Sequence, residues 1–538
     1  MTTGAHPVSG TSVLGATAHL DTFCRDNLPP ADSWPEFVFD LPELHYPDRL
    51  NAAVELLDQH DADRPCLLTT AGERWTYGEV RETVNRVANV LTDLGIVPGN
   101  RVLLRGPNTP WLVACWLAVL RAGAVAVSTM PLLRAGELST IADIARISLA
   151  LCDSRFVADL VAADLGGAPS LTFDELGDHT RNVPADFAAV DTAADDVALL
   201  AFTSGTTGRP KATMHFHRDL LAVTDTFSRH VVKPRAEDVF TGTPPIAFTF
   251  GLGGLVLFPL RVGASTLLIE KASPEELADA IDAHQVSICF TAPTAYRAML
   301  RSGRAASLRG LRRAVSAGEH LPEATWRACY EETGLRLIDG IGSTEMLHVF
   351  VSAADGDIVP GATGRAVPGY RARIVDENGA LVPPGTPGRL AVQGPTGCRY
   401  LADPRQSVYV RDGWNLTGDT FIQDERGYFR YQARSDDMIV SSGYNIAGPE
   451  VEEVLVTHAA VAECCVVGVP DTERGQLVKA FVVLAEHRSG DDVLVAELQA
   501  FVKRNLAPYK YPRAIEFVTG LPRTSTGKLQ RHVLREHG

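Results

Sequence analysis

The stretch TSGTTGRPK, from Thr203 to Lys211, gathers glycines, hydroxyl groups and cations in one short segment. Gly205 and Gly208 allow backbone conformations that turn N–H groups toward an anion. Further donors and positive charge come from the side chains of Thr203, Ser204, Thr206, Thr207, Arg209 and Lys211. These residue types predict a loop that binds the phosphates of a nucleoside triphosphate.

The segments on either side of this loop indicate how it is held. The apolar run VALLAF precedes it, and the strand-like stretch ATMHFH follows Lys211. The spacing differs from the GxxxxGK[ST] pattern, in which a helix follows the lysine. We therefore expect a loop between two strands. A polar surface turn of a hairpin is the alternative interpretation of the loop taken alone.

The chain before the loop alternates between helical and strand patterns. Apolar residues spaced by three and four in TYGEVRETVNRVANVLTDLG predict an amphipathic helix, with a Thr76–Glu79 capping box at its start and Gly95 at its end. NRVLLRG and AVAVSTM are typical of strands, and WLVACWLAVLRAG is typical of a helix. This alternation predicts an α/β fold with a large layered N-terminal domain of sheets and helices.

The pattern changes near residue 434. A helix from Pro449, strands at ECCVVGV, KAFVVL and AIEFV, and a helix containing Leu494 and Leu498 predict a small α+β domain. We place the N-terminal domain at residues 1–434 and the C-terminal domain at residues 435–538. The adjacent acids Asp436 and Asp437 mark a solvated connection between them.

Composition excludes several classes of protein. The net charge of −15 and pI near 5.5 argue against a nucleic-acid partner, which Lys and Arg would have to neutralise. The N-terminus has no secretory pattern, and the longest apolar runs reach about half of a membrane span, so we expect a cytoplasmic protein without a membrane partner. The 9 cysteines are scattered without a CxxC pair, which favours reduced, buried thiols.

Further motifs follow the loop in order: SAGEHLP, DGIGSTEM, LTGD, YQARSDDMIVSSG and LPRTSTGK. In order and spacing they resemble the acyl-adenylate-forming superfamily, which includes acyl-CoA synthetases, firefly luciferase and peptide-synthetase adenylation domains. The resemblance covers nearly the whole chain. It implies that a carboxylate attacks the α-phosphate of ATP, that diphosphate leaves, and that a thiol then displaces AMP. The implied cofactors are ATP, Mg²⁺ and coenzyme A as co-substrate.

The resemblance also implies roles for individual residues. Glu345 corresponds to the carboxylate that binds Mg²⁺, and Thr344 corresponds to the residue that contacts the α-phosphate. A single carboxylate suits Mg²⁺, because this ion binds proteins through few carboxylates and keeps several of its waters. Lys528 corresponds to the lysine that stabilises negative charge while carboxylate and phosphate join. The remaining correspondences are adenine contacts at Gly318, Asp339 and Gly340, ribose contacts at Asp419 and Arg434, a pantetheine tunnel at Gly443, and a hinge at Asp436.

The acid pocket resembles that of benzoate-CoA and 2-aminobenzoate-CoA ligases in the stretches PPIAFTFGLGG and GSTEMLHVF. The resemblance predicts that Phe248 and Phe250 sandwich an aromatic ring, for which Ala317, Gly340 and Gly342 leave room. His348 is expected to close the far end, with a packing role as the alternative. A Thr249 hydroxyl beside the ring favours 2-aminobenzoate over benzoate, because an unpaired buried hydroxyl costs about 1–3 kcal/mol. A bond from Thr249 to its own backbone is the alternative.

Three other functions share parts of this pattern. An enzyme that loads an aryl acid onto a carrier protein would use the same nucleotide motifs, although no carrier segment adjoins them. A luciferase-like oxygenase would need an apolar pocket for a large luciferin. A nucleotide-binding regulator is the non-enzyme alternative, and it would have little reason to keep both Glu345 and Lys528. The sequence leaves open whether the chain forms a homodimer.

Overall fold

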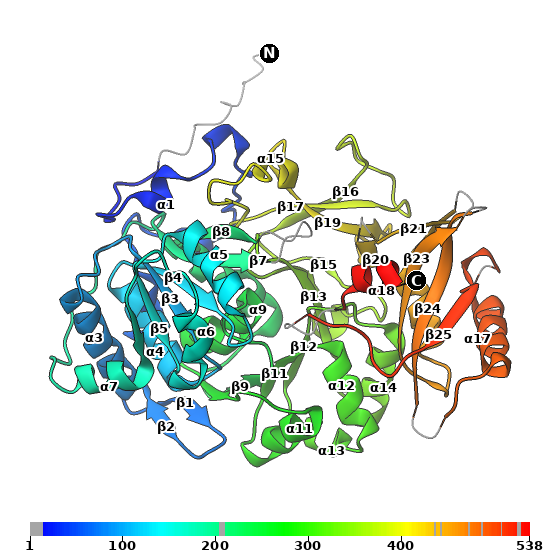
Figure 1. The fold of residues 1–538 in the computed structure, drawn as a ribbon, viewed down its shortest axis with the longest axis horizontal. Helices are drawn as coiled ribbons and strands as arrows, with labels where there is room; N and C mark the ends of the chain where they lie inside the picture. The colour runs from blue at the N-terminus through cyan, green and yellow to red at the C-terminus, as the bar shows by residue number, and fades with distance from the viewer. Residues whose placement is uncertain are drawn as a thin grey trace.

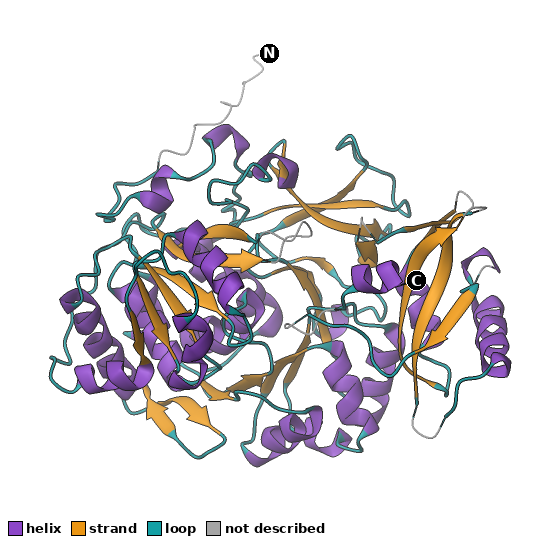
Figure 2. Ribbon diagram, viewed as in Figure 1, coloured by secondary structure: helices purple, strands orange, loops and turns teal. Residues whose placement is uncertain are grey.

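The computed structural model has a large N-terminal domain built on three sheets and a smaller C-terminal domain built on a fourth (Figure 1). It describes residues 14–203, 210–434, 437–441, 444–471, 474–485, 488–506, 508–524 and 529–537. Helices cover the sheets of both domains (Figure 2). This arrangement confirms the predicted α/β fold class.

A six-stranded sheet carries the ends of the glycine-rich loop, in the order β6-β5-β3-β4-β7-β8. Its strands are β3 (Arg101–Arg105), β4 (Val125–Thr129), β5 (Leu149–Cys152), β6 (Ser170–Thr172), β7 (Val197–Thr203) and β8 (Lys211–Phe216). All pairs are parallel except β7 with β8, which are antiparallel. Strands β3 and β4 lie in the two segments that the sequence predicts.

Two predicted helices, α3 (Tyr77–Asp93) and α4 (Pro110–Arg121), also form. Helix α4 packs on β3 and β4, and α3 packs on α4. The Thr76 hydroxyl accepts a hydrogen bond from the Glu79 amide, and the Glu79 carboxylate accepts one from the Thr76 amide. This capping box confirms the predicted start of α3, because it satisfies amides that the first turn leaves unpaired.

A nine-stranded sheet carries the STE segment at one side, in the order β15-β14-β13-β12-β11-β9-β10-β1-β2. Its strands are β1 (Pro65–Thr69), β2 (Arg74–Thr76), β9 (Val239–Gly242), β10 (Ser265–Leu268), β11 (Ile288–Thr291), β12 (Arg313–Ser316), β13 (Ile338–Gly342), β14 (Val349–Ser352) and β15 (Arg365–Ala366). The consecutive strands β11, β12 and β13 are parallel, so their carboxyl ends share one edge. Ala317 follows β12 at this edge, and Gly342 is the last residue of β13.

Other helices of the large domain cover these sheets and connect their strands. They are α1 (Phe23–Asp26), α2 (Ala52–Leu57), α5 (Ala135–Ala145), α6 (Val157–Val161), α7 (Phe173–Thr180), α8 (His217–Val223), α9 (Thr249–Leu252), α10 (Phe258–Val262), α11 (Pro274–Ala283), α12 (Pro293–Arg301), α13 (Ala305–Leu308), α14 (Glu323–Thr333) and α15 (Gln406–Tyr409). Two further segments are π-helical, η4 (Thr224–Val232) and η5 (Gly253–Leu257). The short 3₁₀ turns are η1 (Ala31–Ser33), η2 (Pro42–Leu44), η3 (Ser154–Phe156), η6 (Asp355–Asp357) and η7 (Pro508–Lys510).

The chain passes from a third sheet into the C-terminal domain between residues 434 and 439. The third sheet contains β16 (Arg371–Val375), β17 (Gly388–Gln393), β18 (Val410–Arg411), β19 (Trp414–Gln423) and β20 (Phe429–Arg434). The C-terminal sheet contains β21 (Ile439–Ser441), β22 (Tyr444–Ile446), β23 (Val461–Asp471), β24 (Gly475–Leu484) and β25 (Ala514–Phe517), with helices α16 (Gly448–Leu455), α17 (Asp492–Asn505) and α18 (Arg531–His537). The predicted hinge at Asp436 lies outside the described residues.

The interior confirms the prediction of reduced, buried thiols. All 9 cysteines are free and buried, as predicted for reduced thiols. Burial raises the pKa of all 9 cysteine thiols above the ordinary range. None of the helices in the described part of the chain combines the length and the apolar character that a membrane span requires.

Candidate active site

The glycine-rich loop joins β7 to β8, as the sequence predicts. Thr203 and Lys211 are paired across the two strands, so they form the base of the loop. Residues Ser204, Gly205, Thr206, Thr207, Gly208 and Arg209 lie outside the described residues. The Thr203 hydroxyl oxygen is buried and has no hydrogen-bond partner among the described residues. An unpaired buried hydroxyl at the base of this loop is suited to a ligand.

Lys211, Glu345 and Tyr400 form a half-enclosed polar cluster at the start of β8. The Lys211 ammonium donates to the Tyr400 hydroxyl at 2.6 Å, and this hydroxyl donates to Glu345 Oε1 at 2.6 Å. The direct distance from Lys211 Nζ to Glu345 Oε1 is 3.5 Å. Tyr400 is fully buried, while 17% of the Lys211 side chain and 10% of the Glu345 side chain are exposed to solvent. The cluster connects the loop directly to the STE segment.

Backbone contacts fix the neighbouring residues of the STE segment. His215 Nε2 lies 2.8 Å from the carbonyl oxygen of Thr344. Because a carbonyl only accepts, this ring nitrogen must carry the hydrogen. Burial lowers the pKa of His215 to about 3, so the ring is neutral near pH 7. The Ser343 hydroxyl accepts from the Met346 amide and lies 3.1 Å from the Tyr409 hydroxyl.

A single carboxylate at Glu345 fits an Mg²⁺ ion that arrives with ATP. Among the described residues, no group of three or more His, Cys, Asp or Glu side chains could hold a metal ion by itself. Mg²⁺ commonly binds through one or two carboxylates, several waters and the phosphates of its substrate. The donor set therefore suits Mg²⁺ carried by a nucleotide and not a zinc-like closed site.

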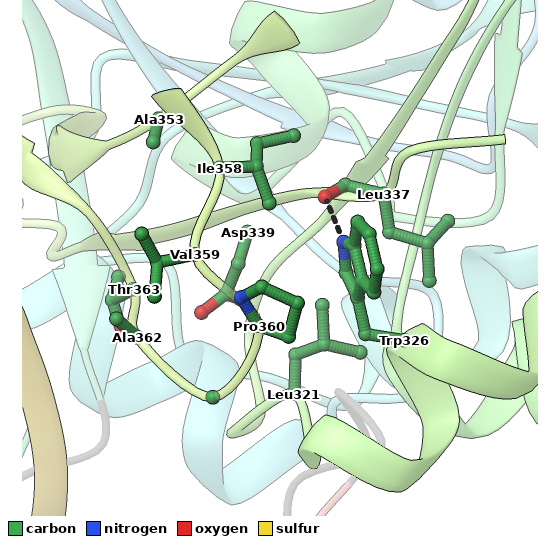
Figure 3. Close-up of a pocket in the computed structure, with 11 residues that line it drawn as sticks. Leu321, Trp326, Leu337, Asp339, Ala353, Ile358, Val359, Pro360, Ala362 and Thr363 are labelled. Carbon is green, nitrogen blue, oxygen red and sulfur yellow. Dashed lines mark hydrogen bonds between the residues drawn. The ribbon is translucent and has the colours of Figure 1, made fainter. Parts of the chain in front are cut away.

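Asp339 lies on β13, at the predicted adenine side. Burial raises the pKa of its carboxyl to about 7, and hydrogen bonds from Thr363 and Gly340 oppose the shift. Asp339 lines a small cavity together with Pro360 and Trp326, which are labelled in Figure 3. The volume of this cavity is about 10 Å³. Such a cavity holds about one water molecule, so it is too small for adenine itself. In the same view the Trp326 indole donates to the Leu337 carbonyl at 3.0 Å.

The remaining predicted nucleotide residues lie on β19, on β20 and in the loop after β12. Asp419 is buried on β19 and faces Arg434 of β20 in the strand register, so the fold brings the two predicted ribose contacts together. The side chain of Arg434 is outside the described part. Gly318 has φ +88°, a conformation that favours glycine. Gly443 and Lys528 lie outside the described residues.

An aromatic cluster surrounds His348 at the predicted acid pocket. Ring centroids of Phe258, Phe227 and Phe250 lie 4.6, 5.3 and 5.7 Å from that of His348. Burial lowers the pKa of His348 to about 3, and the backbone of Phe250 partly offsets this shift by raising the pKa. Neither ring nitrogen of His348 has a well-formed hydrogen bond among the described residues. The imidazole is therefore neutral and available to a polar substituent.

Glycines let this cluster close around His348. A Cβ on Gly253 would lie 2.3 Å from the His348 ring, and one on Gly254 would lie 2.7 Å from the Phe290 ring. Both glycines belong to the π-helix η5, a form that occurs frequently at functional sites. A Cβ on Gly342 would lie 2.6 Å from the His348 carbonyl oxygen. Close packing of their own chain is thus a reason for glycine at these positions.

Other predicted acid-pocket residues lie at the start of α9 and at the sheet edge. Phe248 precedes the first residue of α9, Thr249, and no ring contact joins Phe248 to Phe250 among the described residues. Phe248 instead lines a cleft of about 1360 Å³, together with Thr203, Met130 and Arg523. Ala317 is buried directly after β12. Gly340 lies against Val349, where a Cβ would come within 2.8 Å.

Sequence reasoning missed Tyr400 and His215. Tyr400 lies in CRYLAD, which has no recognisable local motif, and it reaches the site through an isolated bridge between its backbone and that of Thr213. His215 shares a face of β8 with Lys211, because alternate residues of a strand point to the same side. That periodicity is the one signal in the sequence that places His215 near the phosphate loop.

Comparisons with known proteins agree with this geometry. A model of the family described as AMP-binding enzyme matches residues 55–400, and one described as AMP-binding enzyme C-terminal domain matches residues 450–528. The chain therefore belongs to the family of AMP-binding enzymes.

Individual relatives make the same comparison more specific. A benzoate–CoA ligase from Thauera aromatica is 36% identical over 92% of this chain and 97% of its own length. A 3-hydroxybenzoate–CoA ligase from Aromatoleum sp. (strain CIB) is 34% identical over 90% of this chain and 97% of its own. The crystal structure of the anthranilate CoA ligase AuaEII in complex with anthranoyl-AMP has a TM-score of 0.88 and 32% identity, over 92% of this chain and 99% of that one. Within the family of AMP-binding enzymes, the chain therefore belongs to the aryl-CoA ligases, which are AMP-forming acid–CoA ligases.

Proposed function

We propose that this protein activates 2-aminobenzoate, and benzoate less well, to an aryl-adenylate with ATP and transfers the acyl group to coenzyme A. The observation that carries the proposal is the shared cleft: Thr203, at the base of the phosphate loop, and Phe248, at the edge of the acid pocket, line the same 1360 Å³. A nucleotide and an acid bound there would meet. The products are aryl-CoA, AMP and diphosphate.

In the first half-reaction the acid carboxylate attacks the α-phosphate of ATP. Thr344 is proposed to contact that phosphate, and Lys211 with the loop to contact the outgoing phosphates. Glu345 would hold Mg²⁺, which offsets the charge of the phosphates when bound. Lys528, outside the described residues, keeps its sequence-based role of stabilising charge as the new bond forms. Asp339, Asp419 and Gly318 would hold the nucleoside.

In the second half-reaction the thiolate of coenzyme A attacks the acyl carbon, and AMP leaves. This step needs a different group at the reacting centre, so the C-terminal domain would turn about the predicted hinge at Asp436 between the two steps. Gly443 would then line the path of the pantetheine arm. Hinge, tunnel and Lys528 are expectations that rest on the sequence motifs.

The choice of 2-aminobenzoate rests on Thr249. Its side chain is partly buried at the start of α9, next to Phe250, and none of the hydrogen bonds within the described residues involves its hydroxyl. An amino group ortho to the carboxylate would give that hydroxyl a partner. The likeness to an anthranilate CoA ligase bound to anthranoyl-AMP supports this choice, and the likeness to a benzoate–CoA ligase supports the wider aryl class.

The test is acid-dependent exchange of labelled diphosphate into ATP, followed by thioester formation with coenzyme A. We expect exchange with 2-aminobenzoate to exceed exchange with benzoate, and thioester to form with free coenzyme A. Exchange without thioester would instead favour a carrier-protein acceptor. No exchange with any aryl acid would contradict the proposed function.

Thr249→Ala tests the substituent directly. We expect kcat/KM for 2-aminobenzoate to fall about five- to tenfold, the loss of one hydrogen bond, while that for benzoate stays the same or rises. Thr243→Ala is a matched control, because the Thr243 hydroxyl already pairs with that of Thr291 at 2.6 Å. A Thr249→Ala variant that loses both acids equally would show that Thr249 only shapes the pocket.

A further inference from the structure

The Glu345 carboxylate has a cationic partner inside the protein. Lys211 Nζ reaches it directly at 3.5 Å and through the Tyr400 hydroxyl, with two hydrogen bonds of 2.6 Å. The ammonium also lies 4.5 Å from the centroid of the Tyr400 ring, within the range of a cation–π contact. Tyr400 therefore holds Lys211 in two ways, through its ring and through its hydroxyl.

Glu345 is thus the contact point for two cations. It is the proposed ligand of Mg²⁺, and in this structure it pairs with an ammonium. Two positive charges on one partly buried carboxylate repel each other, since charges a few ångströms apart interact strongly where water is scarce. The Lys211 side chain is a flexible stem with a compact charge, so it can exchange one anion for another. Its pairing with Thr203 places it at the base of the proposed phosphate loop, so the anion that it would take up is the triphosphate of the nucleotide.

We propose that Lys211 and Mg²⁺ compete for Glu345, and that Tyr400 is the positioning residue that holds Lys211 on this carboxylate. Arrival of Mg²⁺ with the nucleotide would move Glu345 from the ammonium to the metal and release Lys211 to the phosphates. This inference rests on the proposed roles of Glu345 and Lys211 in binding MgATP. It predicts that ATP binds weakly without Mg²⁺ because Lys211 stays paired.

The coupling can be measured by binding alone. ATP is titrated calorimetrically into the full-length protein, once with EDTA and once with excess Mg²⁺. For Glu345→Gln, we expect metal-free ATP to bind about tenfold more tightly than to the wild type, and the gain from Mg²⁺ to shrink by a similar factor. Tyr400→Phe should give a smaller gain in metal-free binding, because it removes the bridging hydroxyl but keeps the ring.

A double-mutant cycle separates competition from simple loss of negative charge. If Lys211 mediates the effect, Glu345→Gln will give no gain in metal-free binding when Lys211 is already Gln. A gain that persists in the Lys211→Gln background would overturn the proposal, because removal of the acid would then act on ATP directly. An unchanged or weakened affinity of Glu345→Gln for metal-free ATP would overturn it as well.

Tyr428→Phe is the matched control for Tyr400→Phe. Tyr428 is buried and its hydroxyl donates to the Asp357 carbonyl at 2.9 Å. Among the described residues, no hydrogen bond joins it to Glu345 or Lys211. We expect its metal-free affinity to equal that of the wild type. Circular dichroism of each variant checks folding, and if Tyr400→Phe does not fold, the Lys211–Glu345 cycle decides the matter alone.

Thioester formation by the wild type distinguishes failure of this inference from failure of the proposed function. Wild-type aryl-CoA formation together with a persistent gain in the Lys211→Gln background refutes the competition and leaves the function intact. A cycle that behaves as predicted in a protein that activates no aryl acid supports the competition and refutes the function.

Discussion

The protonation state of the Asp339 carboxyl should affect nucleotide binding. Its pKa is raised to about 7, chiefly by burial, so the carboxyl is half protonated near neutral pH. If the adenine amine donates to this group, nucleotide binding favours the ionised form, and AMP affinity should rise between pH 6 and pH 8 by up to about tenfold per pH unit below the pKa. Isothermal titration at pH 6, 7 and 8 measures this slope.

Asp339→Asn is the control for that slope, because an amide accepts a hydrogen bond without titrating, while the phosphate of AMP titrates equally in both proteins. A variant with the wild-type slope would exclude Asp339 as its source.

The raised pKa of Asp339 also makes the stability of the folded protein depend on pH. Its contribution is full below the ordinary value of 3.8 and is lost as pH rises through about 7, so at pH 8 Asp339→Asn should unfold at a higher urea concentration than the wild type.

At the scale of an element, the π-helix η5 determines where the His348 ring lies. Gly253→Ala would place a methyl group 2.3 Å from the ring, and the ring has little room among Phe227, Phe250 and Phe258. We expect a loss of about 1–3 kcal/mol of unfolding free energy and a fall in kcat/KM for the aryl acid, because His348 must move. Chemical denaturation and steady-state kinetics measure the two effects.

Gly310, which lies after α13 and outside the cleft, offers the matched control for Gly253. A Cβ there meets nothing within 4 Å, so Gly310→Ala should be neutral or stabilise the protein by up to about 1 kcal/mol. If Gly253→Ala behaves like Gly310→Ala in both measurements, η5 does not fix the ring of His348.

For the whole molecule, Arg523 connects the two domains beside the cleft. It lies in the tail that leads to Lys528, and its guanidinium donates to Glu319 of the large domain at 2.6 Å and to Glu463 of the small domain at 3.0 Å. Glu319 follows Gly318 at the predicted adenine side. The Arg523–Glu319 ion pair between the domains therefore favours the domain orientation in which Arg523 lies beside the cleft.

Glu319→Gln should slow adenylate formation about five- to tenfold and leave thioester formation from supplied aryl-adenylate nearly unchanged, because the pair stabilises one orientation only. Single-turnover release of diphosphate and single-turnover thioester formation measure the two steps. Glu497→Gln, which changes an exposed acid near His458 within the small domain, is the control. Equal slowing of both steps would mean that the pair stabilises the fold and not an orientation.

Local pattern in the sequence determined the elements and the class of chemistry. The Thr76–Glu79 capping box, the strands on either side of the glycine-rich loop and the small α+β domain all follow from periodicity, caps and turn residues, which act over a few positions. The ordered motifs, from TSGTTGRPK to LPRTSTGK, identified the adenylate-forming family because each preserves the residue types its chemistry needs.

Which distant side chains share an environment depends on how the sheets and helices pack, and the sequence motifs did not predict it. Tyr400 meets Lys211 and Glu345 across separations of 189 and 55 residues, and no local rule relates such positions. The closure of the aromatic cluster on His348 likewise depends on Gly253 of η5, Phe227 of η4 and Phe258 of α10, which all lie far from His348 in the sequence. Side-chain contacts of this kind follow from how sheets and helices stack, which the order of residues along the chain does not specify locally.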